Sequence, residues 1–119
     1  MLILMHGGGS PEGNLYRDQT SFHPHNGFEV LVLHYLDATQ GKAVPSGSSY
    51  RMWSRVLLDL IAREKRREQV MSIGVVGYSL GASVALAAAS QTAPIDAIAE
   101  WYGSMPDSFV ERKSVLPPL

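Results

Sequence analysis

The chain has 119 residues, of which 45% are hydrophobic, and this size and composition fit one domain with one core. Ten Lys and Arg stand against eleven Asp and Glu, so no basic excess favours nucleic acid or an anionic membrane as a partner. The absence of cysteine excludes disulfides, thiol nucleophiles and thiolate metal sites.

The first segment, residues 1–5, is continuously apolar and is followed by His6 and three glycines. A short run of this kind predicts a strand buried on both faces, as in a parallel sheet. It is too short to cross a membrane and has no basic flank, so we expect a cytoplasmic protein. The stretch over residues 7–26 is rich in Gly, Pro, Ser and Asn and predicts a loop, with a short helix over residues 15–20.

A second strand is predicted over residues 28–35, and a loop marked by Gly and Pro over residues 37–49. Ser48 or Ser49 is the expected N-cap of the helix that follows. Its basic end, residues 63–67, is interleaved with glutamate and is expected to be a solvated face with ion pairs. The apolar face of this helix is formed by residues that recur at helical spacing: Trp53, Val56, Leu57, Leu60 and Ile61.

The remaining segments are a third strand over residues 70–78, an Ala-rich helix over 81–92 that Pro94 ends, and a fourth strand over 95–102. Residues 104–119 predict a loop or short helix. Strands that alternate with helices argue for crossover units and a parallel sheet with helices on both faces. The predicted class is therefore α/β, with three layers and about four strands.

Residues 77–81, Gly77-Tyr78-Ser79-Leu80-Gly81, match the pattern G-x-S-x-G. This pattern predicts a sharp turn from strand to helix, where the serine takes a strained backbone conformation and the glycines avoid the neighbouring strand and helix. The hydroxyl of Ser79 would then stand at the carboxyl edge of the sheet, above a helix N-terminus with free N–H groups. The alternative is an ordinary turn of another doubly wound domain, in which the glycines serve the turn alone.

The second motif is His6-Gly7-Gly8-Gly9, directly after the first strand. Glycine lets the backbone approach a substrate carbonyl and direct N–H groups at it. We expect an oxyanion hole formed by the amide of Leu80 and one amide from Gly8 or Gly9, with His6 as a hydrogen-bonded orienting residue rather than a base. The alternatives are a flexible loop or a phosphate loop, but no GxGxxG or GKS/T follows, which disfavours a nucleotide site.

Together these motifs resemble the α/β-hydrolase superfamily, and within it the dienelactone hydrolase-like proteins. Three stretches carry the closer resemblance: residues 73–82, 95–103 and 116–119. The resemblance implies strand order 2-1-3-4 and a serine hydrolase of carboxylic esters with Ser79 as nucleophile, a small-molecule substrate, and no cofactor or metal. It also implies that residues 1–119 form a partial domain, which holds the oxyanion loop and the elbow but not the part with the catalytic acid and histidine.

The positions of the histidines depart from the family pattern, in which the order is serine, acid, histidine. All four histidines precede the serine: His6, His23, His25 and His34. An internal repair would need His23 or His25 to swing over the serine from a loop, with an acid drawn from Asp96, Glu100 and Asp107. A His-x-His metal site is disfavoured because no further ligands accompany it, and Asp37 is expected to be a turn or cap residue.

A serine without its base is a poor nucleophile, so we expect the isolated chain to be weak or inactive. The alternative function is a noncatalytic binding or assembly module that keeps the fold and the pocket. The fourth strand would be an edge although its residues suit a central position, which invites pairing with another chain. We therefore expect a homo-oligomer or a complementing chain at this edge.

Overall fold

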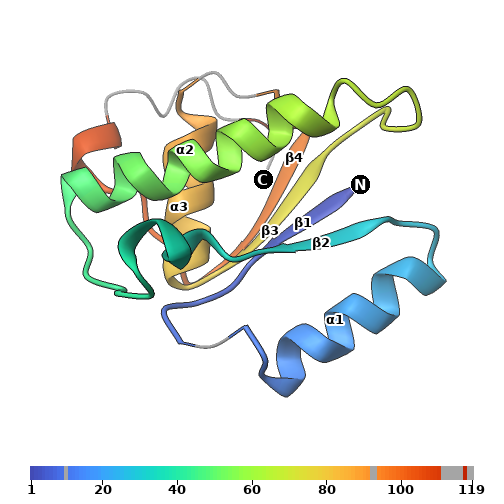
Figure 1. Cartoon of the computed structure of the whole chain (residues 1–119), viewed down its shortest axis with the longest axis horizontal. Helices are drawn as coiled ribbons and strands as arrows, with labels where there is room; N and C mark the ends of the chain where they lie inside the picture. The colour runs from blue at the N-terminus through green and yellow to red at the C-terminus, as the bar shows by residue number, and fades with distance from the viewer. Residues whose placement is uncertain (10, 92–93, 111–116, 118–119) are drawn as a thin grey trace.

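The computed structural model describes residues 1–9, 11–91, 94–110 and 117, without the side chains of residues 22–25. Within this part, four parallel strands form one sheet in the order β2-β1-β3-β4, which confirms the α/β class and the expected strand order (Figure 1). The strands are β1 (Leu2–Met5), β2 (Val30–Leu33), β3 (Gly74–Tyr78) and β4 (Ala97–Trp101).

The helices cover the two faces of the sheet unequally (Figure 1). One face carries two helices that pack on each other, and the other face carries a single helix that lies against β2. The helices are α2 (Gly47–Glu64) and α3 (Leu80–Ala89) on the first face and α1 (Asn14–His25) on the second, with a 3-10 turn η1 (Tyr35–Thr39) before α2. A further 3-10 turn spans residues 107–110.

Alternating strand residues supply the two layers of the core. Ile3, Val75 and Ile98 share the core with α2 and α3, and all three are at most 2% exposed. Leu4 and Val76, one residue further along, point to the opposite face, as the two-residue period of a strand requires. The apolar stripe predicted for α2 is present, and its innermost residues are completely buried: Trp53, Leu57 and Ile61.

Helix α3 is buried from residue 81 to residue 89. Five of these nine residues are alanine and one is glycine, so the helix axis lies close to β3. Close approach compensates for the small area that each alanine buries. The elbow that begins this helix is thereby held against the middle of the sheet.

Helix α1 is longer than the short helix predicted over residues 15–20. It begins after Gly13, whose carbonyl oxygen accepts hydrogen bonds from the amides of Tyr16 and Arg17, and it runs to His25. The prediction that His23 and His25 lie in a loop is therefore wrong, because both belong to the last turn of α1. Their side chains lie outside the described part, and a helical backbone removes the freedom that a swinging loop would have.

The ends of α2 also differ from the prediction. Its N-cap is Ser46, whose hydroxyl accepts a hydrogen bond from the Ser49 amide at 3.0 Å, so the helix begins before the predicted Ser48 or Ser49 cap. At the other end, Glu64 is only 4% exposed and accepts hydrogen bonds from Arg63 and Arg67. The basic run is therefore anchored on a buried carboxylate rather than solvated throughout.

All four strands begin later than predicted, and β2 and β4 also end earlier than predicted. Phe28 is 45% exposed before β2, and Tyr35 already belongs to η1. Half of the tail predicted as a loop or short helix lies outside the described residues, as do residues 116, 118 and 119 of the stretch that resembles the family. None of the helices in the described part is both long enough and apolar enough to span a membrane.

Strand β4 is an edge in the part of the chain that the structure describes, where it pairs only with β3. Ile98 is buried on the α3 side, whereas Ala97, Ala99 and Trp101 are exposed on the other side. The expected second copy or complementing chain at this edge stays a prediction.

Candidate active site

Ser79 is the turning point between β3 and α3. Its backbone lies at φ 51° and ψ −116°, a region that non-glycine residues avoid. Two hydrogen bonds hold it there: its amide donates to the carbonyl oxygen of Trp101 at 2.7 Å, and its carbonyl oxygen accepts from the Ser83 amide at 3.2 Å. The residue is exposed, and within the described part its hydroxyl has no hydrogen-bond partner. The strain is thus held by the surrounding backbone, as at many functional sites.

The two motif glycines leave room for that turn. A Cβ atom on Gly81 would overlap the carbonyl oxygens of Met5 and His6, and one on Gly77 would lie 2.8 Å from the Ala82 amide nitrogen. Gly81 therefore allows the first turn of α3 to sit against the end of β1, and Gly77 allows it to sit against the end of β3, for the reason that the sequence predicts.

A third glycine has a similar role that the sequence analysis did not recognise. A Cβ on Gly103 would overlap Ala82 and come within 3.1 Å of the Ser83 amide nitrogen. The adjacent Ser104 amide donates to the Ser83 hydroxyl at 3.0 Å. The segment after β4 is thus packed onto the elbow from the side opposite β1. The only sequence signal was the glycine itself, directly after an aromatic pair.

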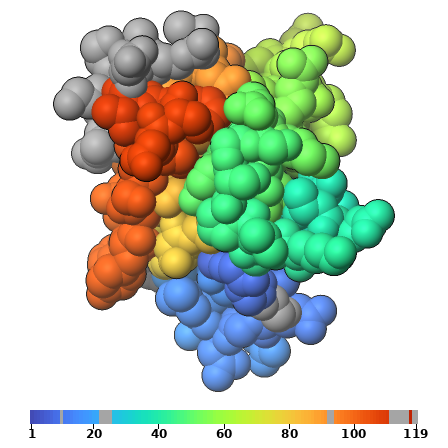
Figure 2. Space-filling model, turned by 90° about the vertical axis from the view of Figure 1, so that its left-hand side faces the viewer, coloured from blue at the N-terminus to red at the C-terminus, as the bar shows by residue number. Residues whose placement is uncertain are grey.

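The triple-glycine loop lies beside the serine although the two are more than 70 residues apart in sequence. A Cβ atom built on Gly7 would be 3.8 Å from Ser79 Cβ, and one on Gly8 would be 3.7 Å from a methyl group of Leu80. Figure 2 looks onto the carboxyl ends of the strands, where the segment around residue 80 reaches the surface between this loop and the chain that follows β4. Gly8 and Gly9 are exposed, and nothing lies within 4 Å of a Cβ on Gly9.

Tyr16, on α1, connects to this loop, and the sequence analysis missed it. Its hydroxyl accepts a hydrogen bond from the Gly7 amide at 2.8 Å, and its ring meets those of His6 and Tyr78 edge to face. The same hydroxyl would lie 3.5 Å from a Cβ on Gly7, which places it close to the serine. No sequence pattern marks this contact, because it depends on how α1 packs under the sheet.

His6 is 2% exposed and is tied to its own loop. Its Nδ1–H donates to the carbonyl oxygen of Gly7 at 2.6 Å, and its carbonyl oxygen accepts from the Tyr35 hydroxyl at 2.7 Å. Burial lowers the pKa of His6, the Gly7 carbonyl partly offsets this, and nearby His34 lowers it further. A neutral His6 donating to Gly7 holds the start of the glycine loop in place.

The candidate acids do not lie together. Asp96 is at the amino end of β4, where its carboxylate accepts from the Ile73 amide at 2.7 Å and from Lys65 at 3.0 Å. Because Ser79 follows the carboxyl end of β3, Asp96 is at the wrong end of the parallel sheet to serve it. The idea that Asp96 belongs to a triad is therefore wrong.

Glu100 accepts a hydrogen bond from the Gly103 amide at 3.0 Å, which ties it to the turn after β4. Asp107 is exposed in the 3-10 turn over residues 107–110. Asp37 is a turn residue as expected, since its carbonyl oxygen accepts from the Gln40 amide in η1. Among the described residues, neither Asp37, Asp96, Glu100 nor Asp107 hydrogen-bonds a histidine.

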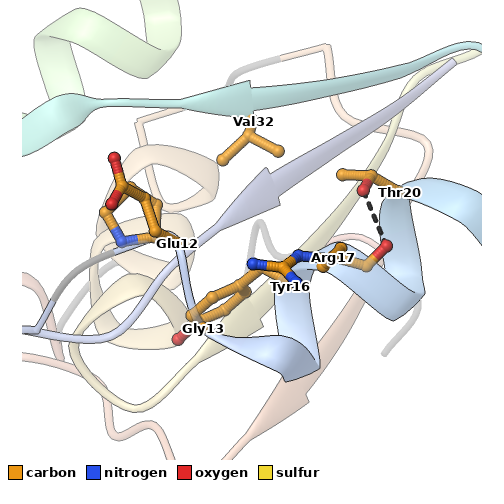
Figure 3. Close-up of a pocket in the computed structure, with 7 residues that line it drawn as sticks. Glu12, Gly13, Tyr16, Arg17, Thr20 and Val32 are labelled. Atoms are coloured by element: carbon orange, nitrogen blue, oxygen red, sulfur yellow. Dashed lines mark hydrogen bonds between the residues drawn. The ribbon is translucent and has the colours of Figure 1, made fainter.

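Several hollows lie around the carboxyl edge in the described part of the chain, and three of them adjoin the glycine loop or α1. The first, of about 270 Å³, is polar and lies between the glycine loop and the segment after β2, with His34 and Asp37 on its wall. The second, of about 300 Å³, lies between α1 and β2 (Figure 3), where Glu12 and Arg17 stand at its rim and Val32 points into it from the strand. The third, of about 320 Å³, lies between α1 and the end of β4.

Comparison with known proteins matches residues 37–116, more than half of the chain, to the model of the dienelactone hydrolase family. The matched region contains the elbow, β3 before it and β4 after it. It does not include the glycine loop, which the structure brings to the elbow from outside the matched residues. No curated protein matches the chain.

Proposed function

The chain belongs to the dienelactone hydrolase family, and from this premise we propose that it is a serine hydrolase of carboxylic esters with Ser79 as its nucleophile. The observation that carries the proposal is the strained, exposed serine at φ 51°, with a glycine loop against it. A backbone held in this conformation directs the hydroxyl outward from the end of a buried strand.

In the proposed reaction, the Ser79 hydroxyl attacks the ester carbonyl carbon and the carbonyl oxygen becomes an oxyanion. The amides of Leu80 and of Gly8 or Gly9 stabilise this charge, helped by the positive end of the α3 dipole. Removing one such donor typically costs about 3 kcal/mol of transition-state stabilisation. Collapse of the tetrahedral intermediate releases the alcohol and leaves an acyl-serine, which water then hydrolyses.

Proton transfer is the weak step of this chain. Attack requires a base within hydrogen-bond reach of the hydroxyl, and among the described side chains no histidine contacts Ser79. His6 already donates to Gly7, and burial keeps it neutral within its loop. We therefore propose that the 119-residue chain turns over slowly, with residual catalysis of roughly 10³ to 10⁴ over water from the oxyanion hole and binding.

A fluorophosphonate reagent and p-nitrophenyl acetate test this proposal together. We expect slow labelling and slow turnover in the wild-type chain, both lost in Ser79→Ala. Ser48→Ala, which removes an exposed serine in the first turn of α2, is the matched control and keeps both. Labelling that survives Ser79→Ala would contradict the choice of nucleophile, and turnover of many per second would contradict the slow step.

The second candidate function is a noncatalytic binding module. It is favoured by the same lack of a histidine at Ser79 among the described side chains. A folded wild-type chain that neither labels nor turns over, yet still binds an ester in its pocket, supports this candidate over the hydrolase.

A further inference from the structure

The hollow of about 320 Å³ between α1 and the end of β4 is lined by large apolar side chains that face water. Leu15 is 49% exposed, Trp101 is 54% exposed and Tyr102 is 93% exposed. Single exposed apolar residues are normal on a protein surface, but three around one hollow form a patch. Tyr78 and Gln19 complete the wall.

This hollow adjoins the candidate nucleophile through the backbone. Tyr78 directly precedes Ser79, and its partner in the β3–β4 register is Trp101. The Trp101 carbonyl oxygen accepts the Ser79 amide at 2.7 Å. The hollow therefore begins at the two residues that flank the serine backbone, on the α1 side of the sheet.

The exposed aromatic residue at the rim is held in place rather than free. Tyr102 has φ 62°, a left-handed conformation that is unfavourable for a bulky residue. The Gly103 amide donates to Glu100, and the Ser104 amide donates to the Ser83 hydroxyl, so the chain on its carboxyl side is fixed. A strained backbone that keeps a large side chain in water beside a strained serine indicates a preorganised contact surface.

Among the described residues, those that line the hollow carry no charged side chain. Glu100, which directly precedes Trp101, accepts the Gly103 amide, and it would repel rather than neutralise an anion. An anionic group would lose water here without gaining a counter-ion, whereas an apolar group gains by burial. A volume of about 320 Å³ lies at the small end of ligand pockets and suits a ring or a short chain.

We propose that this hollow binds an uncharged aromatic or short aliphatic group of the ester on which Ser79 acts, and that Leu15 and Trp101 set this preference. The inference rests on the proposed function, because it takes the serine as the reacting group. It adds the substrate class: neutral, apolar esters rather than esters that carry a carboxylate.

Binding is measured first in the Ser79→Ala chain, which separates it from hydrolysis. The ligands are p-nitrophenyl acetate, p-nitrophenyl butyrate and the anionic p-nitrophenyl hemisuccinate. The signal is tryptophan fluorescence, since Trp53 is completely buried and Trp101 lies on the wall of the hollow. We expect butyrate to bind roughly fourfold tighter per added CH₂ than acetate, and hemisuccinate to bind more weakly than either.

Leu15→Asp tests the site, and Met71→Asp is its matched control. Met71 is 91% exposed and lies before β3, at the opposite end of the sheet, so both variants place a charge on an exposed apolar residue. We expect Leu15→Asp to weaken butyrate binding about tenfold and Met71→Asp to leave it unchanged. Trp101→Phe should remove the fluorescence change and keep most of the binding.

Equal binding of acetate and butyrate, a preference for hemisuccinate, or equal effects of the two Asp variants would each overturn the proposal. So would a dimer that Leu15→Asp dissociates, because the patch would then belong to a second copy. Failure of the proposed function looks different: the chain binds butyrate in this hollow but is never labelled at Ser79. A chain that is labelled but shows no chain-length preference retains the hydrolase proposal and loses this one.

Discussion

The two ends of the parallel sheet differ in how their polar groups are paired. At the amino end, the N-terminal amino group donates to the Ser72 carbonyl, and Asp96 accepts from Lys65 and the Ile73 amide. Arg67 joins Glu64 to Glu29 at the same end. At the carboxyl end, the Ser79 hydroxyl has no hydrogen-bond partner among the described residues, and the backbone there is strained.

This difference separates stability from function. The paired charges at the amino end hold together the loops that precede the strands. Because these polar groups are already paired, few of them are available to bind a ligand. The carboxyl end carries the positive-φ residues Ser79 and Tyr102, together with the exposed glycine loop. Ligands of open parallel sheets bind outside the carboxyl ends of the strands, and here that is the end whose groups remain available.

The largest expected effect comes from the close packing under the elbow. Gly81→Ala places a methyl group against the carbonyl oxygens of Met5 and His6, so we expect a loss of about 3 kcal/mol in the free energy of unfolding. Gly9→Ala, where nothing lies within 4 Å, should change it by less than about 0.5 kcal/mol. Urea unfolding monitored by circular dichroism measures both, and equal midpoints would contradict the packing.

The contact between α1 and the glycine loop should give the next largest effect. Tyr16→Phe leaves the partly buried Gly7 amide without its acceptor, at a cost of about 1–2 kcal/mol in unfolding free energy. The loop then loosens beside Ser79, and we expect labelling by a fluorophosphonate to slow about tenfold. Tyr50→Phe on α2 removes a hydroxyl that makes no hydrogen bond to the glycine loop, and it serves as the control. Equal labelling rates in the two variants would show that Tyr16 does not position the loop.

The paired carboxylates at the amino end of the sheet should make the stability of the fold fall in acid. The Ile73 amide, and then Lys65, lower the pKa of Asp96, while Arg67 and Arg63 lower that of Glu64. Because the unfolded values are higher, this stabilisation is fully present above about pH 5 and is lost as pH falls through the lowered values. Asp96→Asn should lower the free energy of unfolding by about 1 kcal/mol at pH 7. It should also make the loss of stability between pH 7 and pH 3 less steep. Unfolding midpoints between pH 3 and pH 7 measure it, and a variant as acid-sensitive as wild type would exclude the assignment.

The carboxyl end should respond to a smaller degree and at higher pH. Burial lowers the folded pKa of His6 below its ordinary 6.5, so the unfolded chain binds the proton more readily. The contribution of neutral His6 to the free energy of unfolding is therefore fully present above pH 6.5 and declines as pH falls below that value. We expect this decline to be much smaller than the loss caused by Tyr16→Phe. His6→Asn removes this dependence between pH 7 and pH 5.5. Persistence of the slope in that variant would assign it to a group other than His6.

Local patterns explain why the main elements were predictable. The 3.6-residue spacing of Trp53, Leu57 and Ile61 defines one face of α2 wherever the helix packs. The G-x-S-x-G pattern encodes a tight turn through its glycines, and the structure places those glycines where any side chain would collide. Each of these two signals is formed by residues that are close to one another in sequence, so the sequence alone is enough to recognise it.

What the sequence could not supply depends on contacts between distant segments. The amide of Gly7 meets Tyr16 only because the start of α1 packs beside the glycine loop. Asp96 had the right chemistry for a catalytic acid, but the strand direction put it at the opposite edge from Ser79.

Sequence by itself thus determined the α/β class, the elbow and the glycine loop, because turn chemistry and periodicity are local. Only the tertiary structure decided which polar groups are paired and which apolar ones surround the serine. Burial and long-range hydrogen bonds exist only once the strands are side by side, as with the Trp101 carbonyl and the Ser79 amide.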